Sequence, residues 1–267
     1  MKKYFANKSF FVGFSLICFF LLLMIAGFFI QIDPNIPDTA NKFASFSKNH
    51  ILGTDHLGRD VFSRILVGTR ISFGIGFAVM VFGSIVGLFL GSISGYFGGA
   101  LDLIIQKLIT AQMAFPGILL ALMLIAVFGT DAKITIFALC VMSLPRFTRI
   151  TRASFLKYKN SLFVKAARAR GASHARLMIF HILPNALPEL LVTCSLSFAL
   201  AILSESGLSY LGLGIQPPAP SFGRMLNDAQ RFIFRFPQGV IVPAIFLTLL
   251  VLAFNLLGDG ISEVNEK

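Results

Sequence analysis

Long apolar stretches alternate with shorter polar ones along most of this chain. Six of them are apolar and long enough, or nearly so, to predict helices that cross a membrane. The fourth stretch is short and reaches a spanning length only if it continues to residue 150. An even number of spans places both termini on the same side. The six predicted spans are approximately residues 10–32, 71–96, 101–129, 134–147, 187–213 and 239–257.

Glycine and proline interrupt these stretches at informative places. Gly98–Gly99 predicts a turn after the second span, and Asp131 with Lys133 marks a tight turn before the fourth. Pro116 predicts a kink in the third span, because proline donates no backbone hydrogen bond. The second span has glycine at every fourth position, so these glycines share one face that lets another helix approach closely. They are Gly83, Gly87, Gly91 and Gly95.

The first span is predicted to be retained, because its apolar run is longer than a signal-peptide core and no small-residue cleavage site follows. The next segment, to residue 70, is too polar to span. Its second half has apolar residues at helical spacing between Arg59, Arg64 and Arg70. This pattern predicts a short amphipathic helix on the membrane or over a translocation path. We therefore divide the chain into residues 1–70 and a five-span core, 71–267.

Composition supports a membrane protein. Hydrophobic residues make up 56% of the chain and charged residues 13%, whereas a soluble domain has about 25% charged residues. The net charge of +11 would fit a nucleic-acid partner, but the basic residues lie at the edges of apolar runs and are not interleaved with aromatic residues. We expect no nucleic-acid partner. The dense basic run over residues 146–176 predicts the cytoplasmic side, and both termini are expected there.

A helix–glycine–helix unit is predicted within this basic run. Asn160 or Ser161 can cap a short helix, and Gly171 can end it in the left-handed conformation. Ser173 can cap a second helix, which Pro184 would stop. The unit would protrude into the cytoplasm, with basic residues around a face of small side chains.

The segment at about residues 157–184 resembles the Glu-Ala-Ala loop of the permease subunits of ATP-binding-cassette (ABC) importers. That loop has Glu-Ala-Ala, a glycine four residues after the second alanine, and Leu-Pro further on. In the family it is the coupling helix, which docks on a cytoplasmic ATPase subunit, so the resemblance implies this role here. The corresponding residues are Lys165, in place of the glutamate, and Ala166, Ala167, Gly171, Leu183 and Pro184.

Two further stretches narrow the resemblance to the second permease of dipeptide, oligopeptide and nickel importers. They are HILGTDHLGRDVFSRILVGTRIS, and SYLGLGIQPPAPSFGRMLNDAQ followed by AFNLLGDGI. The resemblance implies an all-α integral membrane protein with six transmembrane helices and the type I ABC importer permease fold. It also implies a homologous second permease, two cytoplasmic ATPase subunits and an extracytoplasmic substrate-binding protein as partners, in the inner cell membrane. The cargo stays open among dipeptides, oligopeptides, nickel and metal chelates, although the compact N-terminus and MLNDAQRFIF slightly favour nickel.

Other function classes fit less well. No G-x-x-x-x-G-K-[ST] phosphate loop is present, so ATP is expected on the partner subunits and no cofactor in this chain. An intramembrane enzyme would need a catalytic pair, and neither HExxH nor GxSxG occurs, so we expect no catalytic residue. The alternative is a secondary transporter driven by an ion gradient. Such proteins usually show repeated halves and broken helices, and neither is visible in the sequence.

Several charged residues outside the coupling segment are further candidates. Glu205 is the acid deepest inside an apolar span, so it either lines the path or is a hydrogen-bonded structural residue. The i, i+4 spacing of Asp60 and Arg64 predicts a local ion pair. His50 and His56 lack further ligands, and we expect no metal site. The alternative role, a gate or a contact with the binding protein, involves Asp55, Arg59, Asp60, Arg64 and Asp228.

Overall fold

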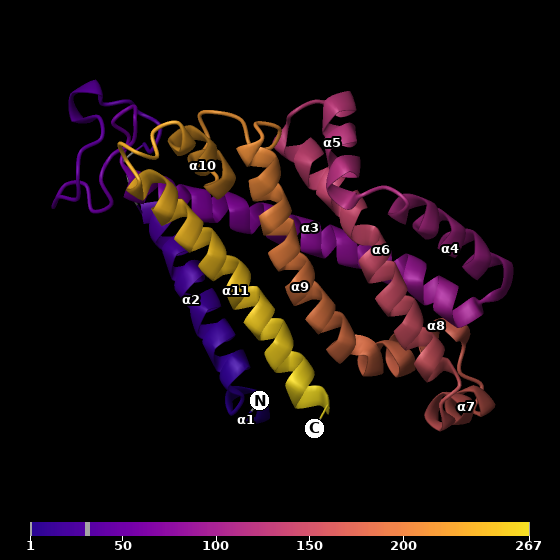
Figure 1. The fold of residues 1–267 in the computed structure, drawn as a ribbon. Helices are drawn as coiled ribbons and strands as arrows, with labels where there is room; N and C mark the ends of the chain where they lie inside the picture. The colour runs from indigo at the N-terminus through magenta and orange to yellow at the C-terminus, as the bar shows by residue number, and fades with distance from the viewer. Residues whose placement is uncertain (1, 30–32, 267) are drawn as a thin grey trace.

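The computed structural model describes residues 2–29 and 33–266, which fold into helices joined by loops (Figure 1). Five of the described helices are long and apolar enough to cross a membrane, and the bent pair α4–α5 is a sixth candidate. The predicted all-α membrane architecture is confirmed. The last residues of the predicted first span, 30–32, lie outside the described residues. The five long helices are α2 (Lys8–Phe29), α3 (Val61–Phe97), α6 (Ala132–Lys159), α9 (Leu183–Tyr210) and α11 (Gln238–Glu266).

Eight shorter elements connect or cap these spans in the described part of the chain. α4 and α5 follow α3, and α7, α8 and η2 lie between α6 and α9. Their bounds are α1 (Lys2–Phe5), η1 (Thr39–Asn41), α4 (Gly99–Met113), α5 (Gly117–Phe128), α7 (Leu162–Ala169), α8 (His174–Arg176), η2 (Leu177–Ile182) and α10 (Phe222–Gln230).

The first and last spans pack along each other, so both chain ends lie at the same end of the molecule (Figure 1). Gly13 permits this contact, because a Cβ there would lie 2.6 Å from the backbone nitrogen of Leu257. At the chain ends, the Asn7 side chain donates a hydrogen bond to Glu263 at 2.7 Å. α11 continues to Glu266, beyond the predicted end of the sixth span at residue 257.

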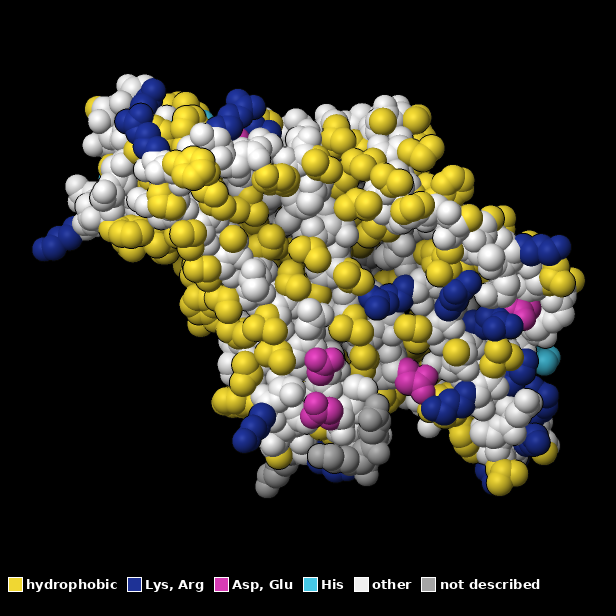
Figure 2. Space-filling view, in the orientation of Figure 1, with side chains coloured by type: hydrophobic (Ala, Val, Ile, Leu, Met, Phe, Trp, Pro, Cys, Tyr) yellow, Lys and Arg dark blue, Asp and Glu magenta, His cyan; other side chains and the backbone are white. Residues whose placement is uncertain are grey.

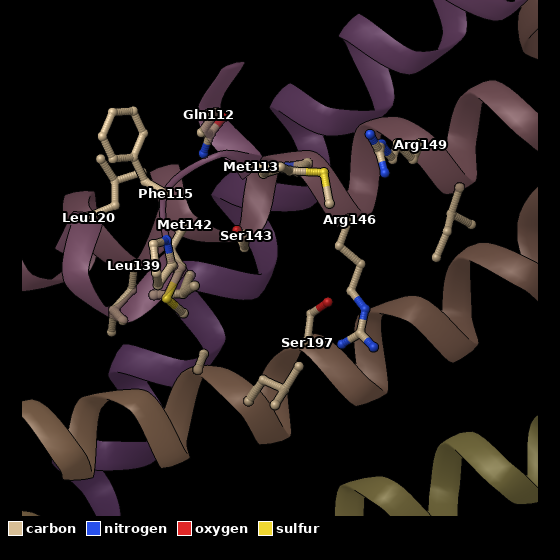
Figure 3. Close-up of a pocket in the computed structure, with 17 residues that line it drawn as sticks. Gln112, Met113, Phe115, Leu120, Leu139, Met142, Ser143, Arg146, Arg149 and Ser197 are labelled. Atoms are coloured by element: carbon tan, nitrogen blue, oxygen red, sulfur yellow. The ribbon is translucent and has the colours of Figure 1, made fainter. Parts of the chain in front are cut away.

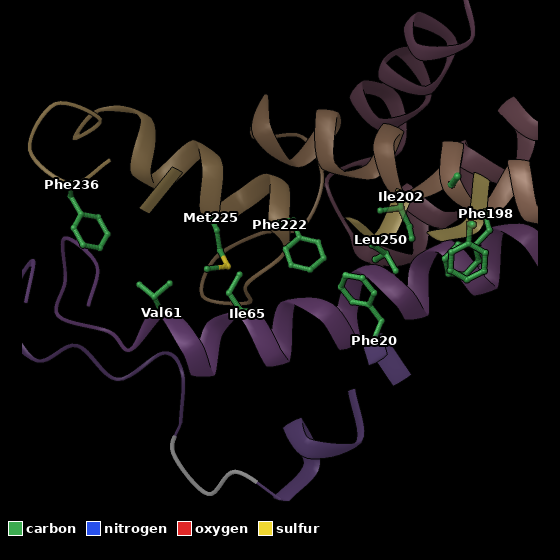
Figure 4. Packing of buried hydrophobic residues seen from close by; sticks show 11 residues of the cluster. Phe20, Val61, Ile65, Phe198, Ile202, Phe222, Met225, Phe236 and Leu250 are labelled. Carbon is green, nitrogen blue, oxygen red and sulfur yellow. The ribbon is translucent and has the colours of Figure 1, made fainter. Parts of the chain in front are cut away.

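α3 begins at Val61, and the separate amphipathic helix predicted before residue 70 is wrong. Asp60 is the N-cap residue, and its carboxylate accepts a hydrogen bond from the Ser63 backbone at 2.7 Å. The apolar face of this segment is buried rather than laid on a membrane. Figure 4 shows Val61 and Ile65 facing the α10 side chains, among which Met225 belongs to the same core cluster. Because α10 covers this face, residues 61–70 continue the spanning helix and the predicted boundary at residue 70 lies inside it.

The main apolar core lies where α2, α3, α9, α10 and α11 meet (Figure 4). Phe198 of α9 stacks on Phe254 of α11 with ring centroids 3.8 Å apart. Phe20 of α2 is completely buried in the same cluster. This core holds the terminal helices to α3 and α9 and leaves α4, α5 and α6 to form the other side of the subunit.

α3 contacts α6 through its glycine face. At Gly91 a Cβ would lie 2.5 Å from the carbonyl oxygen of Thr148, closer than real Cβ atoms approach backbone. The two helix backbones are therefore in contact, as small residues permit in membrane proteins. The other glycines of the face make the same approach to α6: Gly83, Gly87 and Gly95.

The third predicted span is broken rather than kinked. α4 ends at Met113, α5 begins at Gly117, and their axes differ by 85°. Pro116 stands directly before α5 at its N-cap position. A proline supplies no amide hydrogen and disfavours helical conformation in the residue before it, so α4 ends and the next helix starts in a new direction.

α6 is longer than predicted and ends at Lys159. Arg146 and Arg149, which the sequence assigns to the basic run over residues 146–176, therefore lie in the middle of a continuous helix. The stretch after Arg149 looked too polar to span. Thr148 and Thr151 pack directly against Gly91 of α3, and this contact with α3 accounts for a continuous helix here.

Candidate functional site

The predicted helix–glycine–helix unit lies at the same end of the molecule as both termini (Figure 1). α7 starts after Ser161 at its N-cap position, and Gly171 follows α7 with φ +81°, in the left-handed region. Ser173 caps α8, with its hydroxyl accepting a hydrogen bond from the Arg176 backbone at 3.4 Å. Figure 2 shows basic side chains gathered on this lobe, below a surface dominated by apolar side chains.

Pro184 does not stop the second helix of the unit, contrary to the prediction. The chain stays helical from His174 to Tyr210 through the π-helical element η2. In η2 the backbone N–H of Leu183 bonds to the carbonyl oxygen of Met178, five residues back. This wider turn precedes the proline, so Pro184 stands at the start of the regular hydrogen bonding of α9, where its missing amide hydrogen costs little.

α7 has one buried and one exposed face. Val164 is completely buried, and Ala167 packs against the same cluster. On the other face, Leu162 is 84% exposed and Phe163 is 42% exposed, beside the exposed Lys165 and Ala166. Large apolar side chains grouped on a protruding element are typical of a protein-contact surface. The sequence comparison with the family loop did not identify Leu162 or Phe163, although their place one turn before the alanines was a usable signal.

The unit is attached to the end of α3. The Tyr96 hydroxyl lies 2.8 Å from Nδ1 of His174 and accepts a hydrogen bond from Arg168 at 3.3 Å. The ammonium group of Lys159 donates to the Gly95 carbonyl oxygen at 3.0 Å. A displacement of α7 would therefore act on α3 directly.

A cavity of about 640 Å³ lies between the α4–α5 break, α6 and α9 (Figure 3). Most of its wall is apolar. The polar side chains on the wall are Gln112, Ser143, Arg146, Arg149 and Ser197.

A side chain next to the α4–α5 break compensates for the hydrogen bond that the proline of α6 cannot form. Pro145 lies inside α6, so the Val141 carbonyl oxygen four residues before it lacks a helical partner. The side-chain amide of Gln112, at the end of α4, donates a hydrogen bond to that oxygen. The irregular part of α6 and the α4–α5 break are therefore joined at the cavity wall.

Two arginines and a serine bring polar atoms to this cavity. Arg146 and Arg149 are exposed on α6 and form no hydrogen bond or ion pair within the described residues. Ser197 of α9 is 3% exposed, and its hydroxyl has no hydrogen-bond partner in the described chain. Figure 3 shows the Arg146 side chain extending toward Ser197.

Glu205, the predicted pathway acid, does not line this cavity. Its side chain is completely buried and accepts a hydrogen bond from Ser209 at 2.6 Å. Hydroxyls of Ser72 on α3 and Ser206 lie 3.3 and 3.4 Å from its other oxygen. Of the two roles considered for Glu205, this geometry fits the structural one: its hydrogen bonds hold α9 against α3.

The predicted gate residues form a buried charge network at the end opposite α7. Asp228 of α10 forms an ion pair with Arg224 at 2.9 Å and accepts a hydrogen bond from Arg59 at 3.3 Å. Arg59 also pairs with Asp55 at 2.7 Å, and Arg64, 2% exposed, lies 3.7 Å from Asp228. The network joins the segment before α3, the first turn of α3, and α10.

The expected Asp60–Arg64 pair is wrong. The Asp60 carboxylate caps α3 and lies 3.1 Å from Nδ1 of His50 instead, while Arg64 turns toward Asp55 at 3.8 Å. An N-cap residue stands outside the helical hydrogen bonding, so the i, i+4 rule does not apply to it. Within residues 2–29 and 33–266, no group of three or more His, Cys, Asp or Glu side chains could hold a metal ion.

Comparison with known sequences gives consistent matches. The family described as "Binding-protein-dependent transport system inner membrane component" matches residues 83–267. The dipeptide transport system permease protein DppC of Alkalihalophilus pseudofirmus is 36% identical over 251 residues, covering 94% of this chain and 81% of that protein. The glutathione transport system permease protein GsiD of Pectobacterium atrosepticum is 41% identical over 217 residues, covering 81% and 72%.

Solved structures share the fold. The MetNI methionine ABC transporter, in an inward-facing conformation, matches with a TM-score of 0.62 at 18% identity, over 76% of this chain and 95% of that one. An amino acid ABC transporter crystallised with histidines matches with a TM-score of 0.58 at 20% identity, over 73% and 91%. At these identities the likeness concerns the fold alone.

Proposed function

The chain belongs to the binding-protein-dependent transport system inner membrane component family, and from this premise we propose that it imports peptides as one of a pair of permeases. It is a permease subunit of an ABC importer and a multi-pass membrane protein. Peptide cargo is favoured because the relatives described above are named for dipeptide and glutathione transport. None of them is named for nickel, so nickel serves here as the contrasting cargo in the test.

Importers of this family work with ATPase and substrate-binding partners. We assign to this chain one homologous permease, two ATPase subunits and an extracytoplasmic binding protein. The ATPase subunits bind and hydrolyse ATP, and this chain catalyses no reaction. The end that carries α7 and both termini is the cytoplasmic one, which the basic residues of that lobe support (Figure 2).

The observation that carries the coupling role is the exposed apolar face of α7. Leu162 and Phe163 are exposed at the end of the molecule, away from the spanning part of α6. A cleft on an ATPase subunit would bury them. The contacts of Tyr96 with His174 and Arg168 then pass a movement of α7 to α3. Rigid-body movement of this kind opens the path alternately to each side.

At the opposite end, the binding protein docks on the segment before α3 and on α10. The buried network of Arg59, Arg64 and Asp228 ties these two surfaces together. Release of cargo from a docked binding protein and movement of α3 would therefore be linked through the same charges.

A strain lacking this gene, compared with its complemented parent, tests the cargo. Resistance to a toxic dipeptide and cellular nickel at limiting external nickel are measured in the same cultures. We expect the deletion to gain peptide resistance while its nickel content is unchanged. Loss of nickel with unchanged peptide sensitivity would replace peptide by nickel as the cargo.

Two variants of α7 test the coupling role. Leu162→Ser removes an exposed side chain, so it should leave the thermal stability unchanged and abolish ATP-driven uptake. Val164→Ala trims a completely buried side chain of the same helix. It should lower the free energy of unfolding by about 2 kcal/mol and retain uptake at permissive temperature. Normal uptake by Leu162→Ser would show that α7 is not the docking element.

A further inference from the structure

We infer that Arg146 and Ser197 form an anion subsite that binds the carboxylate of the cargo halfway through the membrane, with Arg149 adding positive charge to the same cavity. The inference rests on the proposed peptide import and names a contact that the peptide would make with this subunit. The three residues come from α6 and α9 and line the same cavity (Figure 3).

The depth of Arg146 is the first support. It lies close to the middle of the 28-residue helix α6, so about 20 Å of helix separate it from either end. The hydrocarbon core of a bilayer is about 30 Å thick, which places Arg146 near its centre if α6 crosses the membrane. A charged side chain at that depth is costly and is usually found on a water-filled path or beside an opposite charge.

The absence of an internal counter-charge is the second support. Arg146 and Arg149 have no ion-pair or hydrogen-bond partner in the described chain. The next arginine of the helix behaves differently, because Arg152 pairs with Asp102 at 2.6 Å. α6 therefore neutralises one arginine within the subunit and leaves two facing the cavity.

The hydroxyl of Ser197 is the third support. A serine in a helix commonly donates to the carbonyl oxygen four residues before it, and Thr193 and Ser195 on the same helix do so. Ser197 does not, although its oxygen is enclosed. Ser197 lines the cavity where Arg146 extends toward it, and its hydroxyl has no internal partner that an anion held by the guanidinium group would have to displace (Figure 3).

The chemistry of the site favours a carboxylate. A guanidinium group matches the two oxygens of a carboxylate, and a neighbouring hydroxyl can donate to one of them. Every peptide with a free C-terminus carries this group. The mostly apolar remainder of the wall accepts varied side chains without specific contacts, so the carboxylate would be the feature that different cargoes share.

A carboxylate of the second permease is the competing source of the same charge. A fixed pair between subunits would stabilise the assembled importer and would be indifferent to the cargo. A cargo site would instead affect carboxylate cargo alone. The two sources are therefore separated by comparing a free dipeptide with its C-terminal amide.

The experiment uses the complete importer in proteoliposomes with its binding protein in excess. Uptake of labelled dialanine and of dialanine amide is measured for the parent and for Arg146→Gln, and the ratio of the two rates is compared. The binding protein contributes the same preference in both cases, so a change in the ratio reports the permease. We expect the acid-to-amide ratio to fall about tenfold or more, as when a charge-assisted hydrogen bond is lost.

Ser197→Ala and Arg149→Gln should change the ratio in the same direction, and they keep the inference testable if Arg146→Gln does not assemble. Lys133→Gln is the matched control, because it removes a positive charge from the exposed start of α6, outside the cavity. Its ratio should equal that of the parent.

An unchanged ratio in all three cavity variants would overturn the inference. An equal fall for both cargoes, with weaker association of the subunits, would also overturn it and assign the arginines to the partner permease. A parent importer that takes up neither dialanine nor its amide would instead remove the proposed peptide cargo, and this subsite with it.

Discussion

The side chain of Gln112 and the backbone carbonyl of Val141 form a hydrogen bond between α4 and α6. It exists because Pro145 leaves that carbonyl oxygen without its helical donor. The bond joins two irregular places, the end of α4 before the 85° break and the proline-containing turn of α6, at the wall of the same cavity.

This bond predicts a coupling between Gln112 and Pro145. Gln112→Leu should lower stability by about 1–3 kcal/mol, because the Val141 carbonyl loses its partner. In a Pro145→Ala background the backbone of residue 145 supplies the helical donor, so the same substitution should cost much less. Thermal unfolding of the four proteins in one detergent gives the coupling energy. Additive effects of the two substitutions would contradict this explanation.

The contact between α3 and α6 predicts opposite effects for two glycines of α3. Gly91→Ala should destabilise the protein by about 1–3 kcal/mol, because the new Cβ would lie 2.5 Å from the Thr148 carbonyl oxygen. Gly74→Ala should be neutral or slightly stabilising, because nothing lies within 4 Å of a Cβ there. Unfolding midpoints check both, and equal effects would show that the two helices do not pack this closely.

The buried charge network predicts a large cost for neutralising Asp228. Asp228→Asn should destabilise the fold by about 3 kcal/mol, because Arg59 and Arg224 lose a shared carboxylate. Asp131→Asn is the control, since Asp131 is exposed and caps α6, a position that asparagine fills equally well. A Tm for Asp228→Asn close to that of the control would mean that solvent screens the network.

His56 predicts a pH dependence at the same end of the molecule. Its ring stacks on Phe232 with centroids 5.2 Å apart, and burial lowers the pKa of the imidazole below its ordinary value. The folded protein therefore favours the neutral ring and binds fewer protons than the unfolded chain. This contribution to stability is complete above about pH 6.5 and is lost as the pH falls toward the lowered pKa.

The measurement for His56 is the Tm at pH 7.5 and at pH 5.5. His56→Phe keeps an aromatic ring against Phe232 and cannot take up a proton. The fall in Tm on acidification should be smaller for this variant than for the parent. An identical fall in the two proteins would show that protonation of His56 does not contribute.

The spans, their order and the turn at Gly171 were predictable because apolar length and glycine conformation are local properties of the sequence. The continuation of helices through polar sequence was not. Residues 61–70 have an amphipathic pattern, and their apolar face was assigned to a membrane surface or a translocation path. The helix that covers this face, α10, is about 160 residues further along the chain, so local sequence could not reveal the contact. The polar second half of α6 is helical because it packs against the glycine face of α3, a tertiary effect that periodicity does not report.

The candidate site was predictable in part, for related reasons. The coupling segment has a recognisable pattern, whereas its exposed residues Leu162 and Phe163 depend on which face of α7 is buried. Glu205 was selected because acids are rare in spans, but three serine hydroxyls satisfy it inside the bundle. The arginines on the cavity wall were assigned to the basic run over residues 146–176, since the true length of α6 was not visible in the sequence.

α3 is a 37-residue helix, about 55 Å long, and therefore extends beyond the roughly 30 Å hydrocarbon core. One end is fixed in the arginine–aspartate network, and the other holds the α7 lobe through Tyr96. Because α3 is held at both ends, a tilt of the helix at one end also displaces the other end. Docking events on the two faces of the membrane would then be mechanically interlocked within a single helix, without a relay of side chains between them.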